Sequence, residues 1–548
     1  MRNRNHSALA VVAVAACGMA VAQTAPPAAD EKPASVSGVV TNSVTGEPLL
    51  RAHVTLRGGF NPSNQTPQTY GAMTGAEGKF SITALRPGSY SVSAERIGFE
   101  MAAFPDGGTT TQVTVKSGDT KDDLKLKLVP DGAIAGRVVD ADGEPMEAVS
   151  VTVDTGGFGG GQGTITDDQG HFRIGGLRPG KYRIKATPTN LPIPAEIRTD
   201  GTVEVHYAAT YYPRSLDGKG ATKINVAAGG EVTDADIKSI RTPIVRVSGT
   251  VTGIPQGSRN VSLMVQQGSG ISSGTQVKPD GTFELWRLDP GKHTLSATWR
   301  NAGQALQTAP LEIDVAGSNI DHVELRMVAP SDISGIVQFE DEQAKPQARP
   351  QQQGQGGQQS EPPKPPQRLF LRPPSGFLSG GQQQAEIAAD GSFTLRQIQP
   401  GRYQVTLSWN NAYVKSLRLG QAGMEGRTLD LRNGSAGAAL TVLVSSGVAE
   451  VSGTVRNGDD PAGGKLVALV PDPADGTRPF TARSGPDGAY RFSGIAPGRY
   501  KLAVIDDADQ GAAMSDAGLD DYEDALEISI GAGEKLAKDL KVRAGEGK

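Results

Sequence analysis

The chain has 548 residues, a formal net charge of −5, and only 5% aromatic residues. This mild acidity argues against nucleic acid or an anionic lipid surface as the main partner, because both attract basic patches. The single cysteine, Cys17, excludes an internal disulfide and a cysteine-based zinc or catalytic site in the rest of the chain.

The first residues follow the pattern of an export signal. Two arginines precede an apolar stretch over residues 8–16, which is too short to span a bilayer. Ala22 ends an Ala-Val-Ala sequence typical of signal cleavage, whereas the residues up to Cys17 resemble the lipobox of bacterial lipoproteins. We therefore predict a signal peptide over 1–22 and a flexible tether over 23–34, with a lipid anchor at Cys17 as the alternative to cleavage after Ala22.

No later segment is apolar over the eighteen or more residues that a membrane helix needs. Together with the export signal, this predicts a protein of the periplasm, the outer-membrane surface or the extracellular space, without a transmembrane helix.

One motif recurs five times along the chain. A turn glycine, an apolar strand, a Pro-Gly pair and a second strand follow one another, and the two glycines are always ten residues apart. The second glycines are separated by 92, 111, 110 and 97 residues, a spacing typical of whole domains rather than of solenoid repeats. These glycines are Gly88, Gly180, Gly291, Gly401 and Gly498.

Alternating apolar and polar residues between turn residues predict antiparallel strands with one buried face. About seven short strands in about 100 residues are typical of a sandwich. We predict an all-β fold of five tandem immunoglobulin- or transthyretin-like antiparallel β-sandwiches, with almost no helix. The predicted domains, called repeats 1 to 5 below, span residues 35–129, 130–243, 244–329, 330–448 and 449–548.

Three insertions interrupt the repeats. Residues 343–367 form a Pro/Gln/Gly-rich stretch that predicts a disordered loop within repeat 4. Residues 206–213 add three tyrosines to repeat 2, and residues 506–527 add an acidic segment to repeat 5.

Carboxylates in two places are weak candidates for a calcium site, because this cation prefers oxygen ligands. One group lies within residues 140–144, where a hairpin turn is the competing interpretation. The other lies in the acidic insertion, where a solvated face competes, and neither has EF-hand spacing. The second group comprises Asp520, Asp521, Glu523 and Asp524.

The repeated elements resemble the carboxypeptidase regulatory-like domain, a transthyretin-like β-sandwich related to starch-binding-like folds. The resemblance rests on the Gly-x-Val opening strands, the Gly-x-Phe hairpins and the Pro-Gly-x-Tyr elements, which repeat 4 shows at residues 335–337, 391–393 and 400–403. It implies a seven-stranded Greek-key sandwich that serves as an accessory module, and it supplies no catalytic residues.

No sequence pattern points to an enzyme. The six histidines give neither His-x-x-Glu nor His-Glu-x-x-His, the spacings that a zinc peptidase needs. Residues 270–274 match Gly-x-Ser-x-Gly, but they lie between two β segments rather than on a strand-to-helix turn. We therefore expect no catalytic activity and no cofactor.

A few aromatic residues are candidates for ligand binding. Strand alternation places Trp299 and Trp409 on the core side and Trp286 on the opposite face. Sugars stack on exposed aromatic rings, so Trp286 and the inserted tyrosines are candidates for a polysaccharide site, although packing on their own domain is the favoured interpretation of the tyrosines. The candidate site residues are Trp286, Tyr207, Tyr211 and Tyr212.

The expected function is non-catalytic carbohydrate binding in the cell envelope. The alternative is a structural spacer or scaffold whose partner is an envelope protein. Repetition favours binding, because several weak sites in series gain avidity without new contacts.

Overall fold

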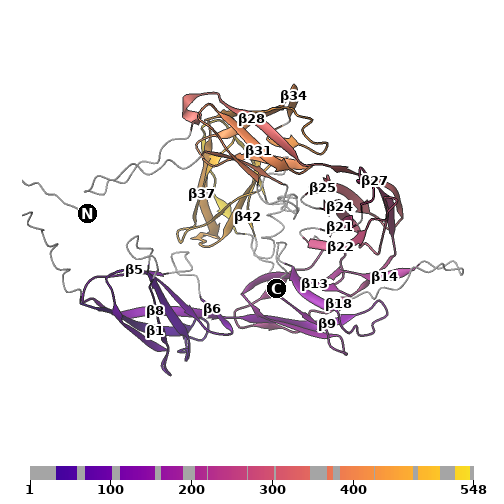
Figure 1. The fold of residues 1–548 in the computed structure, drawn as a ribbon. Coiled ribbons are helices and arrows are strands. Elements are labelled where there is room, and N and C mark those ends of the chain that lie inside the picture. The colour runs from indigo at the N-terminus through magenta and orange to yellow at the C-terminus, as the bar shows by residue number, and fades with distance from the viewer. Residues whose placement is uncertain are drawn as a thin grey trace, which may run out of the picture.

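The structure is a computed structural model, in which most of the described residues lie in β-strands (Figure 1). It describes residues 32–58, 68–101, 111–154, 162–188, 204–218, 220–258, 260–267, 270–301, 304–345, 367–373, 383–424, 426–472, 479–505 and 525–542. In these ranges the only helix is a short 3-10 turn, η1 (Glu342–Ala344). The predicted all-β fold is confirmed, and none of the described helices could cross a membrane.

Repeat 1 consists of two four-stranded sheets. The first sheet contains, in spatial order, β4 (Lys79–Leu85), β1 (Ala34–Asn42), β8 (Thr120–Pro130) and β6 (Phe99–Met101). The second contains β3 (Thr69–Met73), β2 (His53–Gly58), β5 (Gly88–Glu95) and β7 (Thr111–Val115). The inward-facing side chains of both sheets form one hydrophobic core.

Repeat 2 follows the same plan with additions from its insertion. Its first sheet contains β12 (His171–Leu177), β9 (Gly132–Val139), β17 (Glu231–Val232) and β18 (Ile237–Lys238). Its second contains β11 (Gly163–Ile165), β10 (Ser150–Asp154), β13 (Gly180–Thr187), β15 (Thr210–Tyr211) and β16 (Ile224–Val226). A separate pair is formed by β14 (Val205–Ala208) and β19 (Ile240–Pro243).

Repeat 3 differs in that its strands join into one continuous sheet. The order is β22 (Gly270–Gln276), β21 (Ser262–Gln267), β24 (Gly291–Asn301), β25 (Gln304–Thr308), β27 (Ile320–Val328), β20 (Arg246–Thr252) and β23 (Thr282–Trp286), with β26 (Leu311–Val315) also paired to β24. The connection arises because β25 pairs with β24 on one side and with β27 on the other.

Repeats 4 and 5 return to two sheets each. Repeat 4 has β31 (Ser392–Ile398), β28 (Ser331–Phe339), β36 (Leu440–Ser445), β33 (Tyr413–Leu419) and β34 (Ala422–Met424), and opposite them β30 (Gln383–Glu386), β29 (Arg368–Arg372), β32 (Arg402–Leu407) and β35 (Thr428–Asp430). Repeat 5 has β38 (Asp460–Pro461), β37 (Ala449–Asn457), β41 (Ala489–Ile495), β44 (Lys535–Ala537) and β45 (Leu540–Lys541), and opposite them β40 (Phe480–Arg483), β39 (Leu466–Pro471), β42 (Gly498–Ile505) and β43 (Leu526–Ile530).

The sheets are not purely antiparallel. In every repeat the opening strand pairs in parallel with the closing strand, as β1 does with β8 and β20 with β27. All remaining strand pairs are antiparallel, as predicted for a Greek-key sandwich. Within the described residues, each of the main hydrophobic clusters takes its residues from a single repeat. The exact domain boundaries stay a prediction.

The Pro-Gly-x-Tyr element has a clear structural role. In four repeats the tyrosine hydroxyl donates a hydrogen bond of 2.6–2.8 Å to the carbonyl oxygen four residues earlier, which closes the Pro-Gly turn. Repeat 3 has His293 instead, and its Nε2 lies 2.6 Å from the carbonyl oxygen of Asp289. Because a carbonyl can only accept, this bond requires a hydrogen on Nε2 of His293.

The tryptophans lie on the predicted faces. Trp299 is 5% exposed in the core of repeat 3, and Trp409 packs against the core of repeat 4. The indole nitrogen of Trp409 donates to the carbonyl oxygen of Ala344, a buried residue of η1, at 3.2 Å. The start of the predicted disordered loop is therefore ordered through residue 345, and residues 346–366 lie outside the described part of the chain.

Candidate functional site

The tyrosine-rich insertion of repeat 2 forms two short strands with different partners. Strand β14 pairs with β19, which leads out of the repeat, and β15 pairs with β13 on the second sheet. The insertion thus lies beside the connection from repeat 2 to repeat 3, and its side chains divide between the two repeats.

Tyr207 is held by a charged network within repeat 2. Its hydroxyl donates to Oδ2 of Asp140 at 2.9 Å and accepts from Nε of Arg241 at 2.8 Å, and the Arg241 guanidinium lies 5.2 Å from the centre of the Tyr207 ring. A second nitrogen of Arg241 lies 2.5 Å from Oδ2 of Asp142. The hydroxyl and one ring face of Tyr207 are therefore engaged within the protein.

The same network occupies the first calcium candidate. Burial alone would raise the pKa of Asp140, but the hydrogen bonds from Tyr207 and from the backbone amides of Glu144 and Asp142 outweigh it and leave the pKa lowered. Arg241 already supplies a positive charge to Asp140 and Asp142, so a cation would have to compete with this ion pair. No cluster of three or more potential metal ligands occurs among the described residues.

The other two tyrosines also contact repeat 2. The Lys185 ammonium lies 5.7 Å from the centre of the Tyr211 ring, which is half-buried. Tyr212 packs against the hydrophobic core of the repeat, and its amide donates to the carbonyl oxygen of Ile184. These contacts match the packing interpretation of the insertion, while a binding role for the tyrosines stays a prediction.

A buried polar contact joins the insertion to repeat 3. The side chain of His206 is only 3% exposed, and its Nε2 lies 3.2 Å from Oδ1 of Asp289. The other carboxylate oxygen of Asp289 accepts from the backbone amide of Ala209 at 3.2 Å, and Thr242 lies 3.4 Å from Nδ1 of His206. The carboxylate of Asp289 therefore bonds two groups of repeat 2, while its own carbonyl oxygen bonds His293 of repeat 3.

A second ion pair supports the same junction. Glu204 precedes β14, and one of its carboxylate oxygens lies 3.5 Å from a guanidinium nitrogen of Arg287 in repeat 3, with both side chains less than one-fifth exposed. The backbone of Glu204 also accepts from the amide of Ile244. These polar contacts, largely shielded from water, thus join repeats 2 and 3 at the insertion.

Trp286 is exposed, as its strand position predicts. It ends β23, which lies at the edge of the repeat 3 sheet, and its side chain is 43% exposed. Among the described residues no ring contact joins Trp286 to the three inserted tyrosines. A shared binding site of the four candidate residues stays a prediction.

The remaining candidates fall outside the described residues. These are the acidic group Asp520, Asp521, Glu523 and Asp524, together with Cys17 and the cleavage position after Ala22.

Sequence reasoning missed Asp289 and Arg287. A signal was present, because Asp289 is the only acidic residue that directly precedes a Pro-Gly pair of the repeats; the others have Arg, Gln or Ala there. Its partner His206 could not be identified, since the two residues are 83 positions apart.

Comparison with known proteins identifies the sandwich type. Residues 35–129 and 133–205 match the sequence profile of the carboxypeptidase regulatory-like domain. The predicted resemblance is therefore confirmed for these two segments, which correspond to repeat 1 and much of repeat 2. No curated protein sequence matches the chain.

Several solved structures share weak similarity with the chain. The TIE protein of Bacillus anthracis is 18% identical over 54% of this chain, with a TM-score of 0.17, and the match spans about half (51%) of that protein. The minor pilin GBS52 of Streptococcus agalactiae is 16% identical, covering 39% of this chain and 98% of its own, with a TM-score of 0.22. A streptococcal ancillary pilin is 13% identical, covering 54% and 99%, with a TM-score of 0.21.

Proposed function

We propose that this chain is an exported, non-catalytic scaffold of the cell surface, in which β-sandwich repeats hold an envelope partner at a distance. The observation that carries this proposal is the junction between repeats 2 and 3. Its two contacts, His206 with Asp289 and Glu204 with Arg287, are largely shielded from water. A spacer needs such joints, because a string of domains on free linkers bends under little force.

Other observations support a scaffold. The matched family supplies a sandwich without catalytic residues, and the inserted tyrosines contact their own repeat. The predicted export signal over residues 1–22 supports a place outside the cytoplasm, with the scaffold either released after Ala22 or anchored by a lipid on Cys17. An envelope protein is the leading partner.

We expect Asp289→Ala to loosen the junction. The substitution leaves the buried His206 ring and the Ala209 amide without their acceptor, which costs about 1–3 kcal/mol for a charge-assisted pair that is partly shielded from water. Spin labels placed on repeats 2 and 3 of the full chain should show a broader distance distribution by pulsed electron paramagnetic resonance.

Asp280→Ala is the matched control for this experiment. Asp280 lies in the same repeat, but its side chain bonds only Thr282 in its own hairpin. The control should keep the narrow distribution of the wild type. Equal widths for wild type and Asp289→Ala would contradict a fixed junction, and with it the main support for the scaffold.

Polysaccharide binding is a second candidate function, favoured by the exposure of Trp286. We expect Trp286→Ala to weaken co-sedimentation with an insoluble polysaccharide or peptidoglycan by about tenfold, because a stacked ring contributes on the order of 1–2 kcal/mol. Ile336→Ala is the control, since Ile336 is 40% exposed on a strand of repeat 4. Equal losses in both variants would argue against a Trp286 site.

A further inference from the structure

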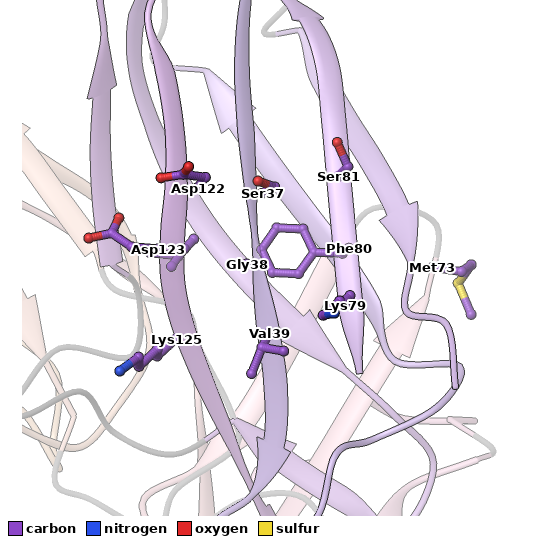
Figure 2. A pocket seen from close by; sticks show the side chains of 11 residues that line it. Ser37, Gly38, Val39, Met73, Lys79, Phe80, Ser81, Asp122, Asp123 and Lys125 are labelled. Carbon is purple, nitrogen blue, oxygen red and sulfur yellow. The ribbon is translucent and has the colours of Figure 1, made fainter. Parts of the chain in front are cut away.

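The outer face of the first sheet of repeat 1 contains a hollow of about 530 Å³, which lies across β4, β1 and β8 (Figure 2). This volume falls within the range typical of small-molecule sites, roughly 300–1,000 Å³. In Figure 2 the side chains form two rows across the three strands. One row contains Asp122, Ser37 and Ser81, and the other contains Lys125, Val39 and Lys79.

The hollow coincides with an irregularity in strand pairing. The register between β1 and β8 shifts between Val36 and Gly38, and Phe80 of β4 stands directly opposite Gly38. Glycine is required at this point, because a Cβ on Gly38 would lie only 2.0 Å from the carbonyl oxygen of Leu124. The exposed side chain of Met73 adds apolar surface at the rim.

Repeat 1 lacks an aspartate that repeats 2 and 5 have where the closing strand approaches the opening-strand glycine. In repeats 2 and 5 this aspartate bonds the amide that follows the opening-strand glycine: Asp236 accepts from Arg137 at 2.9 Å and Asp539 from Thr454 at 2.8 Å. The strand register places Lys125 at the equivalent position in repeat 1, and neither Lys125 nor Asp123 makes a side-chain hydrogen bond or ion pair with another described residue. Both groups therefore remain available to a ligand.

We propose that this hollow binds a saccharide unit of a polysaccharide, which deepens the second candidate function and rests on it. Sugar hydroxyls can donate to Asp122 and Asp123 and accept from Lys125, and the C–H face of a pyranose can lie on Val39 and Met73. The hydroxyls of one sugar can thus hydrogen-bond both the carboxylates and the ammonium group. A charged peptide would instead form exposed ion pairs, which contribute little in water.

The test is affinity electrophoresis of the full chain in gels that contain dextran, mannan or alginate. We expect at least one polymer to retard the wild type and the double variant Asp123→Ala/Lys125→Ala to bind it about tenfold more weakly. The matched control is Asp314→Ala/Lys127→Ala, which removes the same two side-chain types from exposed strand positions outside the hollow. This control should bind like the wild type.

Three results would overturn the proposal. They are no retardation by any polymer, equal weakening in the two double variants, and binding lost in Trp286→Ala but kept in the hollow variant. The third result would place polysaccharide binding at Trp286 instead of the hollow. The experiment therefore distinguishes a wrong site from the absence of polysaccharide binding. The scaffold proposal is tested independently by the distance measurement across the junction.

Discussion

Gly249→Val should unfold repeat 3 while the other repeats stay folded. Gly249 lies in β20, where β27 and the ring of Phe283 come closest to the backbone. A Cβ there would lie 2.0 Å from the carbonyl oxygen of Val323 and 2.8 Å from the Phe283 ring. Because the nearest atom belongs to the backbone of a paired strand, relief requires the strands to separate, at a cost of about 3 kcal/mol or more.

Hydrogen–deuterium exchange by mass spectrometry of the full chain would measure this effect repeat by repeat. Peptides from repeat 3 should lose protection in the variant, and peptides from the other repeats should not. Gly423→Val is the control, because a Cβ on Gly423 has no atom within 4 Å. Protection retained in Gly249→Val would show that the opening-strand glycine is not required by the close approach of β27.

The repeated elements could be predicted because each depends on residues close in sequence. Strand alternation placed Trp286 on the outer face and Trp299 in the core, and their exposed fractions of 43% and 5% confirm both assignments. The turn glycines and the Pro-Gly pairs marked the hairpins for a similar reason, since turn geometry is decided within a few residues.

The junction and the hollow could not be predicted, because they depend on contacts between distant segments. Alternation shows that one face of β14 is buried, but it does not show that Asp289 covers His206. The same reason explains why two further features could not be predicted. These are the parallel pairing of opening and closing strands and the continuous sheet of repeat 3, because the sequence pattern identifies strands but not their neighbours in space.

Repeat 4 should lose stability in strong alkali through Tyr403. Burial raises the pKa of Tyr403 from its ordinary value of 10 to about 12, and its hydroxyl donates to the carbonyl oxygen of Gln399. Since the folded-state pKa is the higher one, the stabilisation is fully present below pH 10 and is lost as the pH rises through 12. A difference of two pKa units corresponds to on the order of 3 kcal/mol.

Tyr403→Phe isolates this effect from the other groups that titrate in alkali. At pH 9 the variant should be less stable than the wild type by about 1 kcal/mol, because it lacks the hydrogen bond to Gln399. Above pH 12 the order should reverse, since phenylalanine has no hydroxyl to ionise. Urea unfolding followed by circular dichroism at pH 9 and pH 12.5 measures both differences, with the half-exposed Tyr413→Phe as the control. The result that would contradict this prediction is a difference in unfolding free energy between wild type and Tyr403→Phe that stays constant from pH 9 to pH 12.5. The Tyr403 hydroxyl would then ionise without disturbing the core, and the Pro-Gly-x-Tyr element would be incompletely shielded from solvent.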